Sequence, residues 1–120
     1  MKIKQSLVAL TAGAAATMAL ATQGVSDTTI TLGSLQDLSG PIAGFGKQLR
    51  FGMEMRVNEI NEQGGIHGRK IDLKFEDMQY DPKKAVIAAQ KLVNQDKVFA
   101  MLGNLGTAVN MAVMPLEFSK

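Results

Sequence analysis

The residues that could carry out chemistry in this 120-residue sequence are few, and their patterns do not indicate catalysis. Glu76 and Asp77 are adjacent in a predicted strand, where neighbouring side chains point to opposite faces, so they are not a working carboxylate pair. Asp81 precedes Pro82 and is expected to cap a helix. His67, the only histidine, lies in a polar turn, and the chain has no cysteine. We therefore expect no catalytic residue, no metal site and no enzymatic activity.

A glycine-rich segment, residues 40–48, has the general composition of a phosphate-binding loop. Pro41 and Gln48 stand where that loop needs glycine and serine or threonine. Leu49 stands where the dinucleotide-binding fingerprint needs its third glycine. The segment thus predicts no nucleotide, and we expect no cofactor.

Two loops rich in glycine and small polar residues, 36–46 and 103–107, are better candidates for a binding site. Phe45 is four residues from Leu49, which fits the buried face of a helix, but an aromatic wall in a glycine-rich mouth also suits a small ligand. Both roles remain open for Phe45. Thr107 opens a predicted helix, where its hydroxyl either caps the helix or helps the free backbone N–H groups to hold a carboxylate.

The segments around these loops alternate between the apolar pattern of a β-strand and that of an α-helix. Strands are expected over residues 28–35, 70–76 and 98–102, and helices over residues 45–60, 81–93 and from 107 onward. The residues expected to face inward are Phe45, Leu49, Met53, Val57 and Ile60 in the first helix, Ala85, Ala88, Ala89, Leu92 and Val93 in the second, and Ala108, Met111 and Ala112 in the third.

The β-α-β-α-β-α order predicts an α/β fold with a doubly wound parallel sheet. Residues 70–76 alternate between apolar and polar, as in an edge strand, whereas residues 98–102 are continuously apolar, as in a central strand covered on both sides. This difference favours the flavodoxin-like strand order 2-1-3. Ligands bind such sheets at the carboxyl ends of strands 1 and 3, where the two candidate loops are expected.

Residues 1–21 have the pattern of a secretory signal peptide. Lys2 and Lys4 precede an uncharged apolar stretch, and Ala19–Ala21 forms an A-x-A cleavage site. The stretch is too short and too rich in small residues for a membrane anchor. We expect cleavage after Ala21, export to the periplasm and no stable membrane insertion.

Removal of the signal leaves residues 22–120 with 11 basic and 11 acidic side chains, so no basic surface predicts a nucleic-acid partner. The segment is long enough for one small domain. Residues 110–120 read as an unfinished helix without a cap. We therefore interpret residues 22–120 as a fragment of a longer protein.

Three motifs resemble the leucine/isoleucine/valine-binding family of periplasmic solute-binding proteins. They are the segments 38–41 (LSGP), 58–70 (N-x-x-N-x-x-G-G-I-x-G-R-K) and 81–85 (D-P-x-x-A), and the similarity runs from Ile30 to about Met114. The resemblance implies a two-lobed protein of the type I periplasmic-binding fold, in which residues 22–120 are the N-terminal part of the first lobe and the second lobe is absent here. Such a protein closes on its ligand and delivers it to the membrane permease of an ABC transporter.

The resemblance also assigns residues to a site. Phe45 matches the aromatic residue that packs on the ligand, and Thr107 matches the hydroxyl residue that helps to hold the ligand's carboxylate. The residues that would line the same turn are Asn104, Leu105, Gly106 and Ala108. Some members join the turns after strands 2 and 3 by a disulfide, and here Tyr80 and Gly106 stand at those places.

The ligand expected from the resemblance is an amino acid, an amide or a small carboxylate, because family members take branched-chain amino acids, amides, urea and aromatic acids. Two alternatives stay open. The chain could be an amide- or amino-acid-sensing receptor module of the same fold, or a truncated product without function. The sequence that follows Lys120 in the gene would distinguish them.

Overall fold

The computed structural model describes residues 22–119, so the predicted signal peptide lies outside the described residues. The elements are β1 (Thr29–Gln36), α1 (Ala43–Glu62), β2 (Lys70–Asp77), α2 (Pro82–Gln90), the π-helical turn η1 (Lys91–Gln95), β3 (Ala100–Met101) and α3 (Thr107–Glu117). Each expected strand and helix is present in the expected order.

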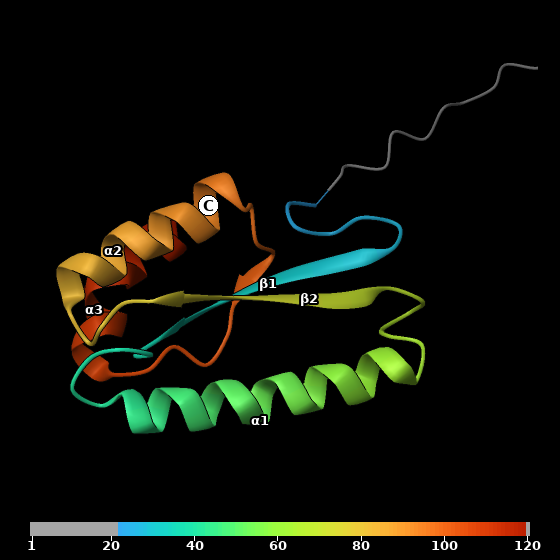
Figure 1. Cartoon of the computed structure of the whole chain (residues 1–120). Helices are drawn as coiled ribbons and strands as arrows, with labels where there is room; N and C mark the ends of the chain where they lie inside the picture. Colours follow the sequence, from blue (N-terminus) through green and yellow to red (C-terminus); the bar gives the residue numbers. More distant parts are fainter. Residues whose placement is uncertain (1–21, 120) are drawn as a thin grey trace, which may run out of the picture.

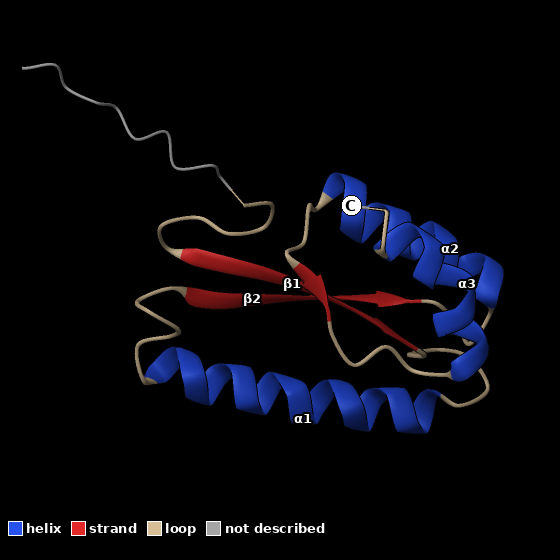
Figure 2. Ribbon diagram, turned by 180° about the vertical axis from the view of Figure 1, so that it is seen from behind, coloured by secondary structure: helices blue, strands red, loops and turns tan. Residues whose placement is uncertain are grey.

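The three strands form one parallel sheet in the order β2-β1-β3, which confirms the predicted fold class. β1 pairs with β2 along its whole length, from Thr29 opposite Lys70 to Gln36 opposite Asp77. β3 pairs with β1 over two residues only. Helix α1 covers one face of the sheet, and α2 and α3 lie side by side over the other (Figures 1 and 2).

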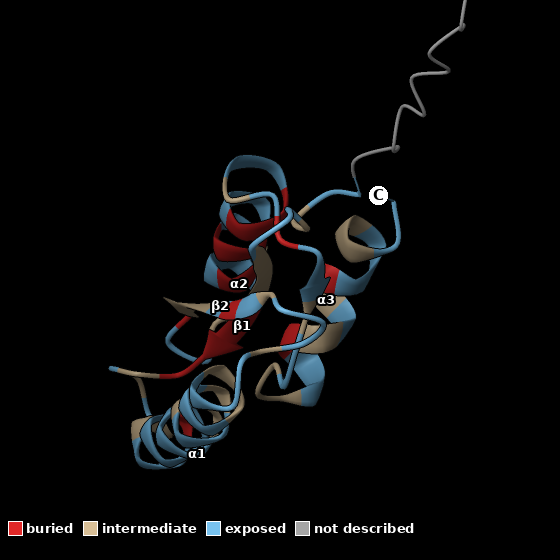
Figure 3. Ribbon diagram, turned by 90° about the vertical axis from the view of Figure 1, so that its right-hand side faces the viewer, coloured by how far each residue is buried: buried red, intermediate tan, exposed pale blue. Residues whose placement is uncertain are grey.

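The hydrophobic core lies between the sheet and the α2–α3 pair. Its buried members come from β1, α2, η1, α3 and the loops beside β2 and β3, and they are Leu35, Met78, Ala85, Ala88, Ala89, Leu92, Val98, Val109 and Val113. Burial is concentrated on this side of the sheet, whereas α1 is largely exposed (Figure 3). Burying these apolar side chains supplies most of the driving force for folding.

Helix α2 begins as its sequence predicts. The carboxylate of Asp81 accepts hydrogen bonds from the N–H groups of Lys83 (2.7 Å) and Lys84 (3.2 Å), and Pro82 fills the first helical position. These two hydrogen bonds lower the pKa of Asp81. The predicted Asp-Pro start of this helix is therefore confirmed.

The predicted inner face of α1 is only partly right. Met53 and Val57 are half-buried, but Phe45 is 68% exposed and Leu49 is 42% exposed. In the first turn of α1 the buried residue is Gly46, which packs so closely on the loop after β1 that a Cβ there would overlap the carbonyl oxygen of Asp37.

The third strand is shorter than predicted, because β3 contains only Ala100 and Met101. Phe99 is 53% exposed and Leu102 is 48% exposed, so the apolar run is not covered on both sides. β3 pairs with β1 along one edge, and no described strand pairs with its other edge. A continuous apolar run is typical of a strand whose two faces are both covered by helices, and the exposed side chains of β3's neighbours do not fit that pattern.

The inner face of α3 is also shifted by one residue from the prediction. Val109 and Val113 are buried, whereas Ala108 and Met111 are exposed and Ala112 is half-buried. Helix α3 packs against α2, and the two valines, one turn apart, fill that interface. None of the helices that the structure describes is long and apolar enough to span a membrane.

Candidate functional site

The turn after β3 is fastened to the end of β1 by three hydrogen bonds. Leu105 N–H donates to Leu35 C=O (3.0 Å), and Leu35 N–H donates to Asn104 Oδ1 (3.0 Å). The side-chain amide of Gln36 donates to Gly103 C=O (2.7 Å). Residues 103–106 thus leave the regular ladder but stay attached to β1. The two candidate loops lie at the same edge of the sheet.

The loop after β1 is built around the buried carboxylate of Asp37. This group accepts hydrogen bonds from Gly40 N–H (2.5 Å) and Ile42 N–H (2.8 Å), which carry the chain into α1. The first turn of α1 then sits directly on this loop, because a Cβ on Gly46 would overlap the carbonyl oxygen of Asp37. Phe45 lies in that first turn with its ring exposed.

Asp77 ties the same loop to the end of β2. Its carboxylate accepts hydrogen bonds from Ser39 Oγ (2.5 Å), Leu38 N–H (2.9 Å) and Gln79 N–H (3.1 Å). Slight burial acts to raise the pKa of Asp77, but the bonds from Ser39, Leu38 and Gln79 outweigh it, so the pKa is lowered. The structural role expected for Asp77 fits this arrangement.

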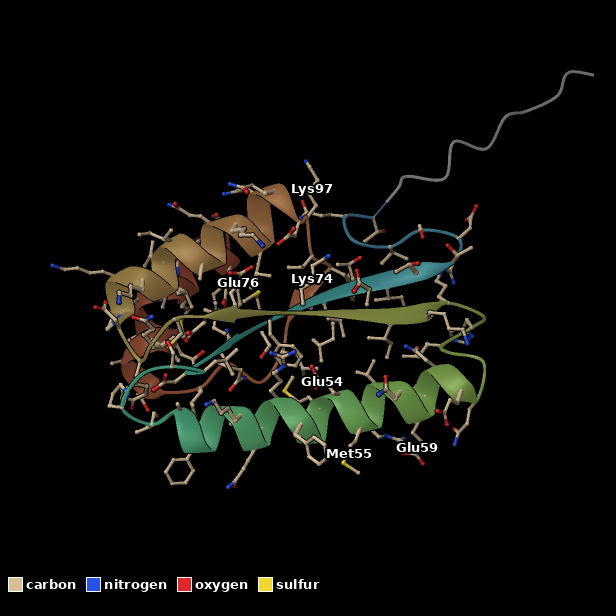
Figure 4. All side chains as sticks on the ribbon, in the orientation of Figure 1. Glu54, Met55, Glu59, Lys74, Glu76 and Lys97 are labelled. Atoms are coloured by element: carbon tan, nitrogen blue, oxygen red, sulfur yellow. The ribbon has the colours of Figure 1, made fainter. Side chains whose placement is uncertain are left out.

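Glu76, the neighbour of Asp77, is engaged elsewhere. It lies on the α2 side of β2 (Figure 4) and forms an ion pair with Lys91. Lys91 also pairs with Asp96 (3.0 Å), and hydrogen bonds from Lys91 to Glu76 and Asp96 raise the pKa of the lysine. The cluster joins β2 to η1 and does not reach the candidate loops.

Helix α3 begins at Thr107 with an open N-terminus. Gly106 occupies the N-cap position with φ 101°, and no side chain caps the first turn. The expectation that the Thr107 hydroxyl caps this helix is therefore wrong, because Thr107 is already the first helical residue. Thr107 and Ala108 are exposed, and their N–H groups have no acceptor within residues 22–119. Such a terminus favours an anion.

The other residues predicted for this turn make contacts within the fold. Asn104 accepts a hydrogen bond through its side-chain oxygen from the Leu35 N–H, and its side-chain NH₂ group donates to Glu117 Oε1 (3.0 Å). Leu105 packs against the hydrophobic core. Gly106 lies under the ring of Tyr80. Among the residues predicted for the site, the exposed ones are thus Phe45, Thr107 and Ala108.

Sequence reasoning did not single out Gln36 or Glu117, and it noted Tyr80 only as a replaced cysteine. Gln36 is fully buried, and its amide oxygen has no hydrogen-bond partner among the described residues. Glu117 is half-buried, which raises its pKa, although the hydrogen bond from Asn104 acts in the opposite direction. The polar side chain that ends β1 was the available signal for Gln36.

A cavity of about 550 Å³ lies along the free edge of β3, away from the two candidate loops. Its lining comes from the N-terminal segment, η1, β3 and the end of α3, and includes Gln23, Val93, Phe99, Glu117 and Phe118. Within the described part of the chain, no group of three or more side chains is suited to hold a metal ion.

The sequence of residues 29–116 matches the periplasmic binding protein family. A Leu/Ile/Val-binding protein homolog from Brucella melitensis is 40% identical over 99 residues, which are 82% of this chain and 26% of that protein. BraC3, a Leu/Ile/Val-binding protein from Rhizobium johnstonii, is 37% identical over 108 residues, which are 90% of this chain and 29% of that protein. The chain thus spans about a quarter of the length of these relatives.

Two solved structures share the fold. A fatty acid ABC transporter substrate-binding protein from Thermomonospora curvata matches with a TM-score of 0.75 and 37% identity, covering 78% of this chain and 24% of the other. A branched-chain amino acid transporter substrate-binding protein from Streptococcus pneumoniae, solved with isoleucine, matches with a TM-score of 0.73 and 29% identity, covering 77% and 26%. The chain belongs to the periplasmic binding protein family and resembles its Leu/Ile/Val-binding members.

Proposed function

We propose that this protein is the extracytoplasmic solute-binding component of an ABC transporter, that it binds branched-chain amino acids or related small polar solutes for uptake, and that it is not an enzyme. Its partner would be the membrane permease of that transporter. Export through the signal peptide at residues 1–21 would place it in the periplasm. Residues 22–120 would then form part of the first of two lobes.

The observation that carries this proposal is the open N-terminus of α3 at the carboxyl ends of β1 and β3. The N–H groups of Thr107 and Ala108 lack acceptors in the described part of the chain, and the Thr107 hydroxyl is exposed beside them. Backbone N–H groups and the positive end of the helix dipole suit a carboxylate. We propose that they bind the carboxylate of the solute, and that Phe45 packs on its apolar part.

The names of the relatives support the same chemistry. Leucine, isoleucine and valine differ from fatty acids in their apolar parts, and the two classes share a carboxylate. Relatives named for both classes match this chain at 29–40% identity. A site built around carboxylate binding is the common requirement, and the rest of the pocket would set the choice of ligand.

The test is a thermal-shift and calorimetry screen of the mature protein, from Thr22 through any sequence that follows Lys120 in its gene. The panel contains leucine, isoleucine, valine, leucinamide and small carboxylates. A ligand at a hundredfold excess over Kd stabilises the folded state by about 2.7 kcal/mol. We expect leucine to stabilise the protein and leucinamide, which lacks the carboxylate, to do so far less.

Matched variants locate the site. Thr107→Ala and Phe45→Ala should each weaken binding, whereas Thr28→Ala and Phe51→Ala, which truncate exposed residues of the same types away from the mouth, should leave it unchanged. A folded protein that no member of the panel stabilises would contradict the proposal. Loss of solute uptake after gene deletion would separate a transport component from a sensing module.

A further inference from the structure

A chain of side-chain hydrogen bonds connects the last turn of α3 to the end of β1. Glu117 Oε1 accepts from Asn104 Nδ2 (3.0 Å), and Asn104 Oδ1 accepts from the Leu35 N–H (3.0 Å). Glu117 is the final residue of α3, thirteen positions after Asn104. The segment 103–106, which precedes α3, is therefore held in place by a residue at the C-terminal end of α3.

The orientation of the Asn104 amide in this chain is fixed by its chemistry. The Leu35 N–H is a donor and requires the amide oxygen, so the NH₂ group must face the other way. Glu117 supplies the acceptor that this NH₂ group needs in a half-buried place. Without that acceptor a half-buried amide donor would be left without a partner, which is unfavourable.

Asn110, near the start of α3, also holds the segment 103–106 in place. Asn110 Nδ2 donates to the carbonyl groups of Gly106 (2.9 Å) and Asn104 (3.3 Å). The bond from Asn110 constrains the backbone of the turn, and the bond to Glu117 constrains its side chain. Together they determine where the open N–H groups of Thr107 and Ala108 lie relative to β1.

We propose that Glu117 is a positioning residue for ligand binding, which acts through Asn104 to set the turn 103–106 and with it the N-terminus of α3. The proposal rests on the proposed function, because it assigns the ligand's carboxylate to that N-terminus. Glu117 itself need not touch the ligand, since it lines the cavity at the free edge of β3.

The test compares Glu117→Ala with Glu117→Gln in the whole mature protein, by calorimetric titration with the solute that binds the wild type. Glu117→Ala should raise Kd about tenfold, the effect of about one lost hydrogen bond. Glu117→Gln keeps an acceptor oxygen for Asn104 and should change Kd less than about twofold. A wild-type Kd for Glu117→Ala, or an equal loss in both variants, would overturn the proposal.

Two controls separate positioning from general stability. Glu62→Ala removes an exposed glutamate at the end of α1 that forms no ion pair with a described residue, and Val113→Ala destabilises the core one turn before Glu117. Both should retain the wild-type Kd at a temperature where each variant is folded. A tenfold loss in Val113→Ala would show that stability alone governs affinity, and would overturn the proposal.

One readout does not depend on a ligand. In NMR spectra of the wild type, the Asn104 side-chain amide should exchange slowly with solvent, and Glu117→Ala should make that exchange faster while Glu117→Gln preserves it. If no solute of the panel binds the wild type, the proposed function fails but this measurement still tests the contact. Fast exchange in the wild type would overturn the positioning role by itself.

Discussion

The ring of Tyr80 lies directly on Gly106, so closely that a Cβ on residue 106 would overlap Tyr80 Cε2. The contact joins the loop after β2 to the turn that opens α3. Tyr80 itself adopts a left-handed backbone conformation, φ 54°.

Gly106→Ala should lower the free energy of unfolding by about 1–3 kcal/mol, because residue 106 has φ 101° and its added methyl group meets the Tyr80 ring. Gly52→Ala is the matched control, since Gly52 lies within α1 and a Cβ there meets nothing. It should stabilise the protein by about 0.5–1 kcal/mol. Urea denaturation measures both.

The double variant Gly106→Ala/Tyr80→Ala separates the two sources of this cost. Removing the ring relieves the overlap but leaves the backbone strain at residue 106, so part of the loss should persist relative to Tyr80→Ala alone. Additive effects of the two substitutions would contradict the contact between Tyr80 and Gly106.

Leu35→Ala should destabilise the protein by about 2–5 kcal/mol, because Leu35 is fully buried in the core between the sheet and the α2–α3 pair. Ile87→Ala is its control on an exposed face of α2, where the change should stay within about 0.5 kcal/mol. Thermal denaturation followed by circular dichroism gives both values. A similar loss for the two variants would contradict the position of the core.

The pKa of Asp77 predicts loss of stability in acid. Its folded pKa lies below the ordinary value of 3.8, so the carboxylate contributes stability that is complete above that value and is lost as pH falls through the folded pKa. Asp77→Asn should be less stable than the wild type near neutral pH and should lose less on acidification. Asp27→Asn, at an exposed aspartate near the start of β1, is the control substitution.

Glu117 should show the opposite pH dependence. Burial raises its pKa above the ordinary value of 4.5, so its contribution favours folding below that value and is lost as pH rises through the folded pKa. Glu117→Gln should therefore gain stability relative to the wild type as pH rises from about 4 to about 7. Denaturation curves at several pH values check this, and a constant difference between the two proteins would contradict it.

Much of the fold was predictable because it depends on local patterns. The alternation at residues 70–76 identified β2, and Asp81 before Pro82 identified the start of α2, because capping and strand periodicity involve residues a few positions apart. The order β2-β1-β3 was also predicted, although β3 lies at an edge of the described sheet and not in its centre.

Predictions that depended on the surroundings of an element were less accurate. The apolar run at residues 98–102 gave only a two-residue strand at an edge of the described sheet, with Phe99 and Leu102 exposed. In α3 a face beginning at Ala108 and a face beginning at Val109 both have helical spacing, and contact with α2 selects the second. Periodicity identifies a helix but does not state which of two adjacent stripes meets a neighbour.

The sequence by itself determined the order and type of the elements, the family, and the two loops at the carboxyl ends of β1 and β3. Only the tertiary structure decided how those loops are held. Asn104 contacts Leu35 across 69 positions, and Tyr80 contacts Gly106 from another loop. The sequence shows which hydrogen bonds and contacts each side chain is able to make. It does not show the partner, because residues far apart in the chain come into contact only when the sheet and helices pack together.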